Sequence, residues 1–123
     1  MSAVWEHWQY LEVALQDVGD ERERQEERWG QQNHESSYSA SNRLRYRGEA
    51  QRWREINDAR IKEGRLTWDG ILLEEVFEAL AEGDDALRRA ELIQVAAVAV
   101  AEIEAIDRRN APAPSDLPSA VAA

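Results

Sequence analysis

Apolar residues recur along most of this chain at intervals of three and four, the spacing that predicts amphipathic α-helices. The clearest stripe follows Thr67, where one side of a helix carries Leu72, Leu73, Val76, Phe77 and Leu80. From Leu92 to Ile106 the chain is apolar almost all the way round, which is typical of a helix covered by neighbours on most faces. The stretch Thr67–Arg109 is therefore predicted to form two helices joined by a short polar turn around Gly83.

The first half of the chain predicts further helices. Residues 3–17 place Trp8, Leu11 and Leu15 on one side, together with Val4 or Trp5. Gly19 and Asp20 are expected to break that helix, with Asp20 capping a new one that runs to Trp29. Another helix is expected from about 43 to 63, ending at Gly64, with these core positions: Leu44, Trp53, Ile56, Ala59 and Ile61.

These elements predict an all-α fold, a bundle of four to five helices in one domain covering residues 1–109. The following tail, 110–123, is rich in Pro, Ala and Ser and is expected to be disordered. The apolar surface of Leu92–Ile106 exceeds what one small domain covers easily, so a homodimer or higher homo-oligomer is expected.

The amino-acid composition excludes several classes of function. The chain has 123 residues and a net charge of −10, which argues against binding to nucleic acid polymers. It contains no cysteine, which excludes disulfides and thiol chemistry. No secretory leader and no membrane-spanning run is recognisable, so a cytoplasmic location without membrane contact is expected.

The most distinctive chemistry lies in the Thr67–Arg109 stretch. Glu74, Glu75 and Glu78 lie within one turn of each other, and Glu91 and Gln94 share a face of the next helix. Two facing helices would then offer an oxygen-lined pocket for a hard cation such as Mg²⁺, with Glu75, Glu78, Glu91 and Gln94 as ligands. The alternative, a solvated acidic face, is left open by the spacing alone.

A second unusual segment begins at Trp29. It combines an aromatic ring, a glycine, amides and an imidazole, in the order Trp29, Gly30, Gln31, Gln32, Asn33, His34. Such a set can stack on a base and hydrogen-bond to its edge, although the residues alone favour a helix cap at Gly30 followed by a plain polar turn. Arg24 and Arg28, just before it, alternate with glutamates and read either as surface ion pairs or as phosphate ligands.

The chain resembles the MazG-like all-α nucleoside triphosphate pyrophosphohydrolases, whose signature is EExxE…ExxD. The resemblance covers roughly Val18 to Arg109 and is closest to small stand-alone proteins of actinobacteria and their phages. It rests on these blocks: Glu74-Glu75-x-x-Glu78, Glu91-x-x-Gln94, Glu21-Arg-x-Arg24-Gln25, Trp29-Gly30-x-Gln32-Asn33-His34, Gly64-Arg-Leu-Thr-Trp68 and Ile71-Leu-Leu-Glu-Glu-Val. One departure is that Gln94 stands where the signature has Asp.

The resemblance implies a Mg²⁺-dependent enzyme, with Mn²⁺ as a possible substitute, that hydrolyses a nucleoside triphosphate to a monophosphate and pyrophosphate. Its catalytic carboxylates would be Glu74, Glu75, Glu78 and Glu91, with Glu74 holding water or supporting a ligand. Its substrate-binding residues would be Arg24, Arg28, Trp29, Gln32, Asn33 and His34. Because Gln94 carries no charge, two alternatives stay open: a protein that binds nucleotides without turnover, and a purely structural helical dimer.

Overall fold

The computed structural model describes residues 2–36 and 38–111, with side chains from His7 onward. It is all-α in this part of the chain, with four helices: α1 (Ser2–Trp29), α2 (Ala40–Lys62), α3 (Trp68–Ala81) and α4 (Asp85–Arg109). The predicted fold class is thereby confirmed. Among the described residues, none of these helices is both long enough and apolar enough to cross a membrane. The tail beyond residue 111 and the side chains of Val4 and Trp5 lie outside the described residues.

The break predicted at Gly19 and Asp20 is wrong, because α1 runs through both residues as one helix of 28 residues. The side chain of Asp20 accepts a hydrogen bond from Gln16 at 2.8 Å instead of capping a new helix. A single glycine costs a helix about 1 kcal/mol relative to alanine, and the Leu, Ala, Glu and Arg residues around it are strong helix formers. The helix ends only at Gly30, which has a positive φ of 68°.

The caps of the other helices follow the sequence closely. Thr67 caps α3 by accepting a hydrogen bond from the backbone N–H of Gly70. Asp84 caps α4 in the same way, through the backbone N–H of Leu87. Helix α2 begins earlier than the predicted residue 43, because Ser39 caps it at the backbone N–H of Asn42.

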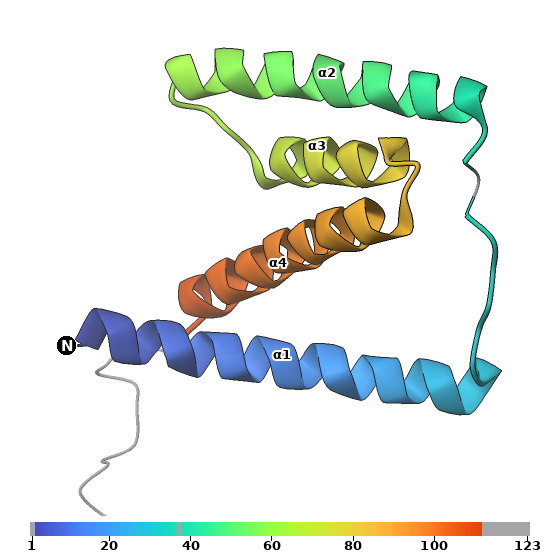
Figure 1. The fold of residues 1–123 in the computed structure, drawn as a ribbon. Helices are drawn as coiled ribbons and strands as arrows, with labels where there is room; N and C mark the ends of the chain where they lie inside the picture. Colours follow the sequence, from blue (N-terminus) through green and yellow to red (C-terminus); the bar gives the residue numbers. More distant parts are fainter. Residues whose placement is uncertain (1, 37, 112–123) are drawn as a thin grey trace, which may run out of the picture.

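The helices stack in the order α2, α3, α4, α1, so that helix α3 lies between α2 and α4 (Figure 1). Helix α1 contacts only α4 among the described helices. Its second half diverges from the stack, and residues 30–36 and 38–39 lie between the end of α1 and the start of α2 (Figure 1). The connection between α3 and α4 is short, which keeps the end of α3 beside the start of α4.

The apolar core of the described chain is small. Its buried apolar residues are Ala14, Ala50, Ala79 and Val100, and no large side chain is fully buried. The predicted core positions Leu44 and Ile61 are wrong for the single chain, since they are 68% and 58% exposed. The periodicity placed them on an apolar stripe, but no other described helix of this chain packs against that side of α2.

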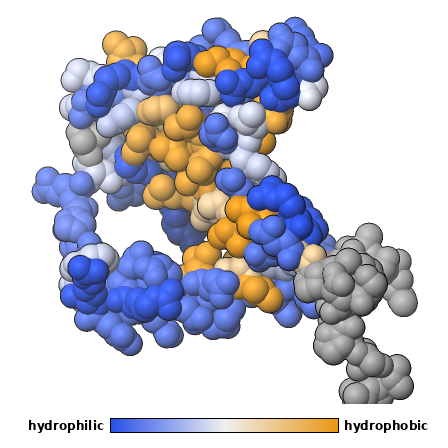
Figure 2. Space-filling model, turned by 180° about the vertical axis from the view of Figure 1, so that it is seen from behind, coloured by the Kyte–Doolittle hydropathy of each residue, from blue (hydrophilic) through white to orange (hydrophobic). Residues whose placement is uncertain are grey.

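Helix α4 is also less covered than its sequence predicts. Leu92 and Ile93 are about half exposed, and Ile106 is also exposed. Figure 2 shows hydrophobic side chains gathered over the middle of the molecule, with a hollow separating them from part of α1. One chain therefore leaves much of its apolar surface in water.

Candidate metal and phosphate site

The site is built on three helices whose ends are fixed by local signals. Thr67 caps the start of α3, and Glu75 and Glu78 lie about one turn apart along this helix. Asp84 starts α4 so that Glu91 falls in its second turn, beside the end of α3. The sequence predicts the spacing of these carboxylates within each helix, whereas the contact between the two helices is seen only in the tertiary structure.

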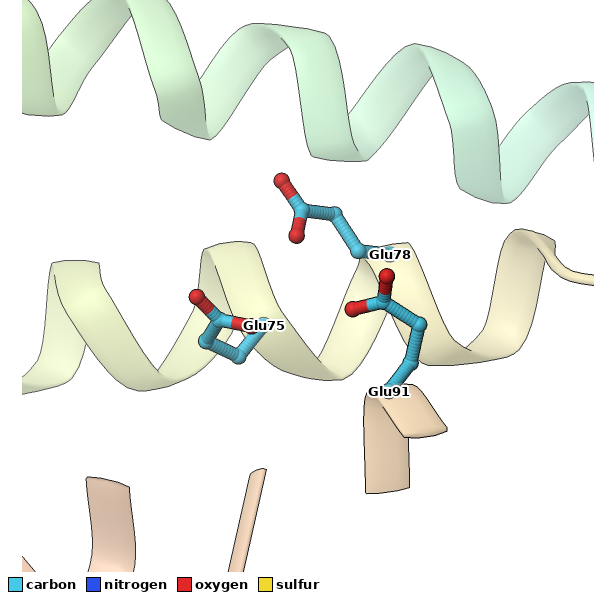
Figure 3. Close-up of side chains that lie close together, drawn as sticks. All are labelled: Glu75, Glu78 and Glu91. Carbon is cyan, nitrogen blue, oxygen red and sulfur yellow. The ribbon is translucent and has the colours of Figure 1, made fainter. Parts of the chain in front are cut away.

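Glu75, Glu78 and Glu91 form what we call the carboxylate cluster. One oxygen from each residue lies within 4.8 Å of the others, and all three side chains are partly buried. Figure 3 shows Glu91 reaching from α4 toward α3, while Glu78 points toward α2. Three converging carboxylates with one ligand oxygen each are a suitable set for a hard divalent cation.

Two oxygens in the cluster have no hydrogen-bond partner. Glu75 Oε2 and Glu91 Oε2 are both buried and unpaired within the described protein. A buried carboxylate oxygen without a partner is unfavourable by about 1–3 kcal/mol, and a cation is the group that would satisfy several such oxygens together. This observation favours a binding site over a solvated acidic face.

The pKa values of two carboxyls in the cluster are raised, as their burial and close spacing would lead one to expect. Burial, followed by the charges of Glu78, Glu91 and Glu74, raises the pKa of the Glu75 carboxyl. Burial, followed by the charges of Glu78 and Glu82, raises the pKa of Glu91. Both carboxylates are therefore harder to ionise than in water, and a divalent cation would reverse that effect.

Glu74 lies outside the cluster. Its Oε1 accepts a hydrogen bond of 2.8 Å from Asn57 Nδ2, and its Oε2 lies 3.8 Å from the guanidinium of Arg54. Asn57 is buried and also donates to the backbone carbonyl of Gly70 at 2.9 Å. These contacts hold Glu74 against α2, which matches a supporting role better than direct cation binding.

Asn57 was not identified from the sequence. It is a lone polar residue in a charged helix, and nothing local distinguishes it from an exposed asparagine. The sequence feature that could have pointed to this contact is the glycine at position 70. In the structure, a Cβ on Gly70 would lie 2.3 Å from Asn57 Oδ1. Helices α2 and α3 thus approach closely at this point, and only glycine fits.

Arg54 is a second residue of α2 that contacts the glutamates of α3. Its Nη2 donates to Glu78 Oε1 at 2.9 Å, and this hydrogen bond raises the pKa of the guanidinium. It borders a cavity of about 310 Å³ between α2, α3 and the start of α4, which we call the α2–α3 cavity. The cavity is lined by Arg47, Ala50, Gln51, Arg54, Glu78, Ala81, Glu82 and Glu91.

Gln94 does not share this environment. It is exposed on α4 and does not line the α2–α3 cavity. Glu91, one turn before it, supplies the oxygen from α4 that joins the carboxylate cluster. The pocket expected from sequence is therefore assembled from three of its four proposed ligands.

The other proposed substrate-binding residues lie apart from the cavity in this chain. Trp29, Gln31, Gln32, Asn33 and His34 line a shallow hollow of their own, in which His34 Nε2 and Gln32 Oε1 are 2.9 Å apart. Arg28 stacks over the Trp29 ring at 4.9 Å.

Arg24 pairs with Glu21 at 2.8 Å on the exposed side of α1. Neither Arg24, Arg28 nor the residues of the hollow lines the cavity beside the carboxylate cluster. In one chain the α2–α3 cavity and the hollow at Trp29–His34 are thus separate surfaces, whereas the family resemblance implies that their residues act on one substrate.

Comparison with known proteins gives no match to a family model, to a curated protein or to a solved structure. The geometry of the site is therefore the main evidence for what the protein does.

Proposed function

We propose that this protein is a divalent-cation-dependent nucleoside triphosphate pyrophosphohydrolase. The observation that carries the proposal is the carboxylate cluster, in which three glutamates from two helices converge and two buried oxygens have no partner. The sequence blocks that resemble the MazG-like enzymes support the same reaction. Water would add to the α-phosphorus, the bond from that atom to the bridging oxygen would break, and pyrophosphate would leave from the nucleoside monophosphate.

Glu75, Glu78 and Glu91 would hold Mg²⁺, or Mn²⁺ in its place. When bound, the cation would neutralise phosphate oxygens and acidify water beside the α-phosphorus. The protein's own part is to hold these carboxylates at short range in a partly buried site. Asn57 and Arg54 fix Glu74 against α2, so that Glu74 supports the geometry of its neighbours on α3.

A second candidate is a nucleotide-binding protein without turnover. It is favoured by Gln94, which is uncharged where the resembling enzymes have Asp, and which is exposed and away from the cavity. A site with one charge fewer binds cations more weakly. Such a protein would bind a nucleotide with its cation and release it unchanged.

Pyrophosphate release from a panel of ribo- and deoxynucleoside triphosphates in 10 mM Mg²⁺ is the direct test. Glu78→Gln is expected to remove activity by at least about 100-fold, because it takes one charge from the cation site. Glu49→Gln is the matched control, since Glu49 also pairs with an arginine but lies outside the α2–α3 cavity. Binding without release in the wild type would favour the second candidate, and absence of both would leave only a structural helical protein.

We also propose that the working unit is a homodimer or a higher homo-oligomer. A groove of about 300 Å³ runs between α1 and α4, and its lining is almost entirely apolar: Leu11, Leu15, Ile93, Ala96, Ala97, Val100 and Glu104. On the same two helices, Val13, Val18 and Leu92 are exposed as well. The absence of any fully buried large side chain in the described chain argues that a second copy completes the core. Because the proposed substrates are nucleotides, we expect this unit to work in the cytoplasm.

Sedimentation velocity measures this assembly directly. The wild type is expected to sediment as a dimer or larger at about 10 μM. Ile93→Glu puts a charge in the groove and is expected to give monomers, whereas Leu44→Glu changes an exposed residue of α2 that does not line the groove. A monomeric wild type, or a dimer unaffected by Ile93→Glu, would contradict this assignment of the interface.

A further inference from the structure

Arg54 occupies a position between two carboxylates of α3. Its guanidinium donates to Glu78 at 2.9 Å and lies 3.8 Å from Glu74. No other ion pair in the described chain involves a member of the carboxylate cluster. Arg54 is therefore the resident positive charge of the site, and it engages an oxygen of a residue that a divalent cation would also need.

The cavity beside Arg54 has walls of opposite charge. Helix α2 contributes Arg47, Gln51 and Arg54, whereas α3 and α4 contribute Glu78, Glu82 and Glu91. A cation bound to the carboxylates would thus face two guanidinium groups across the cavity. A polyphosphate is the ligand that matches both walls, because its oxygens bind divalent cations on one side and arginines on the other.

Arg54 is the exposed member of these ion pairs. Its side chain is 48% exposed and also donates to Gln51 Oε1 at 2.9 Å, so exchanging the Glu78 carboxylate for another partner needs no rearrangement of the core. The carboxylates that it contacts are more buried, at 22% for Glu74 and 23% for Glu78. The arginine is therefore the member of the ion pair that can change partner at the lower cost.

We propose that Arg54 is an exchangeable counter-cation: it neutralises Glu78 while the cation site is empty, and it transfers to a phosphate group when a divalent cation takes its place. Arg47 is the second phosphate ligand on the same wall. This inference rests on the proposed cation site and adds the residues that bind the polyphosphate. The proposal also predicts that the cation and the polyphosphate bind cooperatively. A cation on Glu78 leaves the Arg54 guanidinium without its partner, and a polyphosphate that binds Arg54 leaves the Glu78 carboxylate without its partner, so each ligand favours binding of the other.

Calorimetry with Mn²⁺ alone, and then with inorganic tripolyphosphate in saturating Mn²⁺, tests the exchange. Arg54→Gln is expected to bind Mn²⁺ about threefold to tenfold more tightly than the wild type, since a competing positive charge is gone. The same variant is expected to bind tripolyphosphate about tenfold more weakly. Arg47→Gln should weaken tripolyphosphate binding and change Mn²⁺ affinity less, because Arg47 has no ion pair with the carboxylates in the described chain.

Arg52→Gln is the matched control. It removes the same charge from the same helix, but its guanidinium pairs with Glu49 and does not line the cavity. Effects of equal size in Arg52→Gln and Arg54→Gln would reduce the result to net charge and overturn the proposal. Circular dichroism of each variant checks that the helices are retained.

The outcomes separate this inference from the function on which it rests. If the wild type binds no Mn²⁺, the cation site and the exchange both fail. If the wild type binds Mn²⁺ but Arg54→Gln binds it equally or more weakly, the cation site stands and the exchange is overturned, because Arg54 then only orients Glu78. Tighter Mn²⁺ binding together with weaker tripolyphosphate binding is the result that supports it.

Discussion

Replacing Glu75 by glutamine should change the stability of the protein in opposite directions without metal and with Mg²⁺. The substitution keeps the size of the side chain and removes one of three neighbouring negative charges. In the metal-free protein this relieves repulsion, whereas in the presence of Mg²⁺ it removes a ligand. We therefore expect Glu75→Gln to stabilise the metal-free protein and to abolish its stabilisation by Mg²⁺.

The size of the effect follows from the distances in the cluster. Two unit charges 4.8 Å apart repel by about 0.9 kcal/mol in water and by about 3.5 kcal/mol at an effective dielectric constant of 20. Because the cluster is only partly buried, values near the lower end apply, and we expect a net gain of about 1 kcal/mol in the free energy of unfolding. A bound cation at 100 times its dissociation constant would add about 2.7 kcal/mol to the wild type.

The pH dependence of this gain has a definite sign. Burial and the neighbouring charges raise the pKa of Glu75 in the folded protein, so the folded state binds its proton more readily than the unfolded chain. Stability from this group therefore falls as the pH rises from the ordinary glutamate pKa through the raised value. The advantage of Glu75→Gln should be full above the raised pKa and should vanish below about pH 4, near the ordinary value.

Urea unfolding at one protein concentration, with EDTA or with 10 mM MgCl₂, measures both effects. Glu27→Gln is the control, because Glu27 is exposed on α1 and lies outside the cluster. A variant that is less stable than the wild type in EDTA would refute the reasoning, since Glu75 would then be held by a favourable contact. A variant still stabilised by Mg²⁺ as strongly as the wild type would remove Glu75 from the cation site.

Three other outcomes follow from the same geometry. Gly70→Ala should lower the free energy of unfolding by about 2–3 kcal/mol in urea titrations, because its Cβ would lie 2.3 Å from Asn57 Oδ1, whereas Gly48→Ala, with nothing within 4 Å, should raise it by about 0.5–1 kcal/mol. Asn57→Ala should lower turnover and weaken Mn²⁺ binding in calorimetry by releasing Glu74, and unchanged Mn²⁺ affinity would deny Asn57 a role at the site. Mn²⁺ affinity should rise as the pH rises above the ordinary glutamate pKa, because the cation competes with protons for the carboxylate cluster, and a flat profile would place the cation elsewhere.

The sequence predicts much of the secondary structure. Helical periodicity predicted two helices within Thr67–Arg109, joined by a turn around Gly83, and α3 and α4 lie there. Periodicity is a local signal, acting over one turn, and it also gave the spacing of the glutamates within each helix. The missed continuity of α1 has a local cause too, since Gly19 weakens a helix without ending it and only the flanking residues decide the outcome.

The partners of the site were decided by tertiary structure. Whether Arg54 meets Glu78, or Asn57 meets Glu74, depends on how α2 is rotated and shifted against α3, and no spacing within either helix records that. The same packing turned Glu74 away from the cluster and left Gln94 exposed on α4. The sequence by itself determined the all-α class and an acidic face on α3, because those follow from neighbours three and four residues apart. Only the packing of α2 and α4 on α3 made that face a site, because a contact between helices depends on the rotation and offset of both.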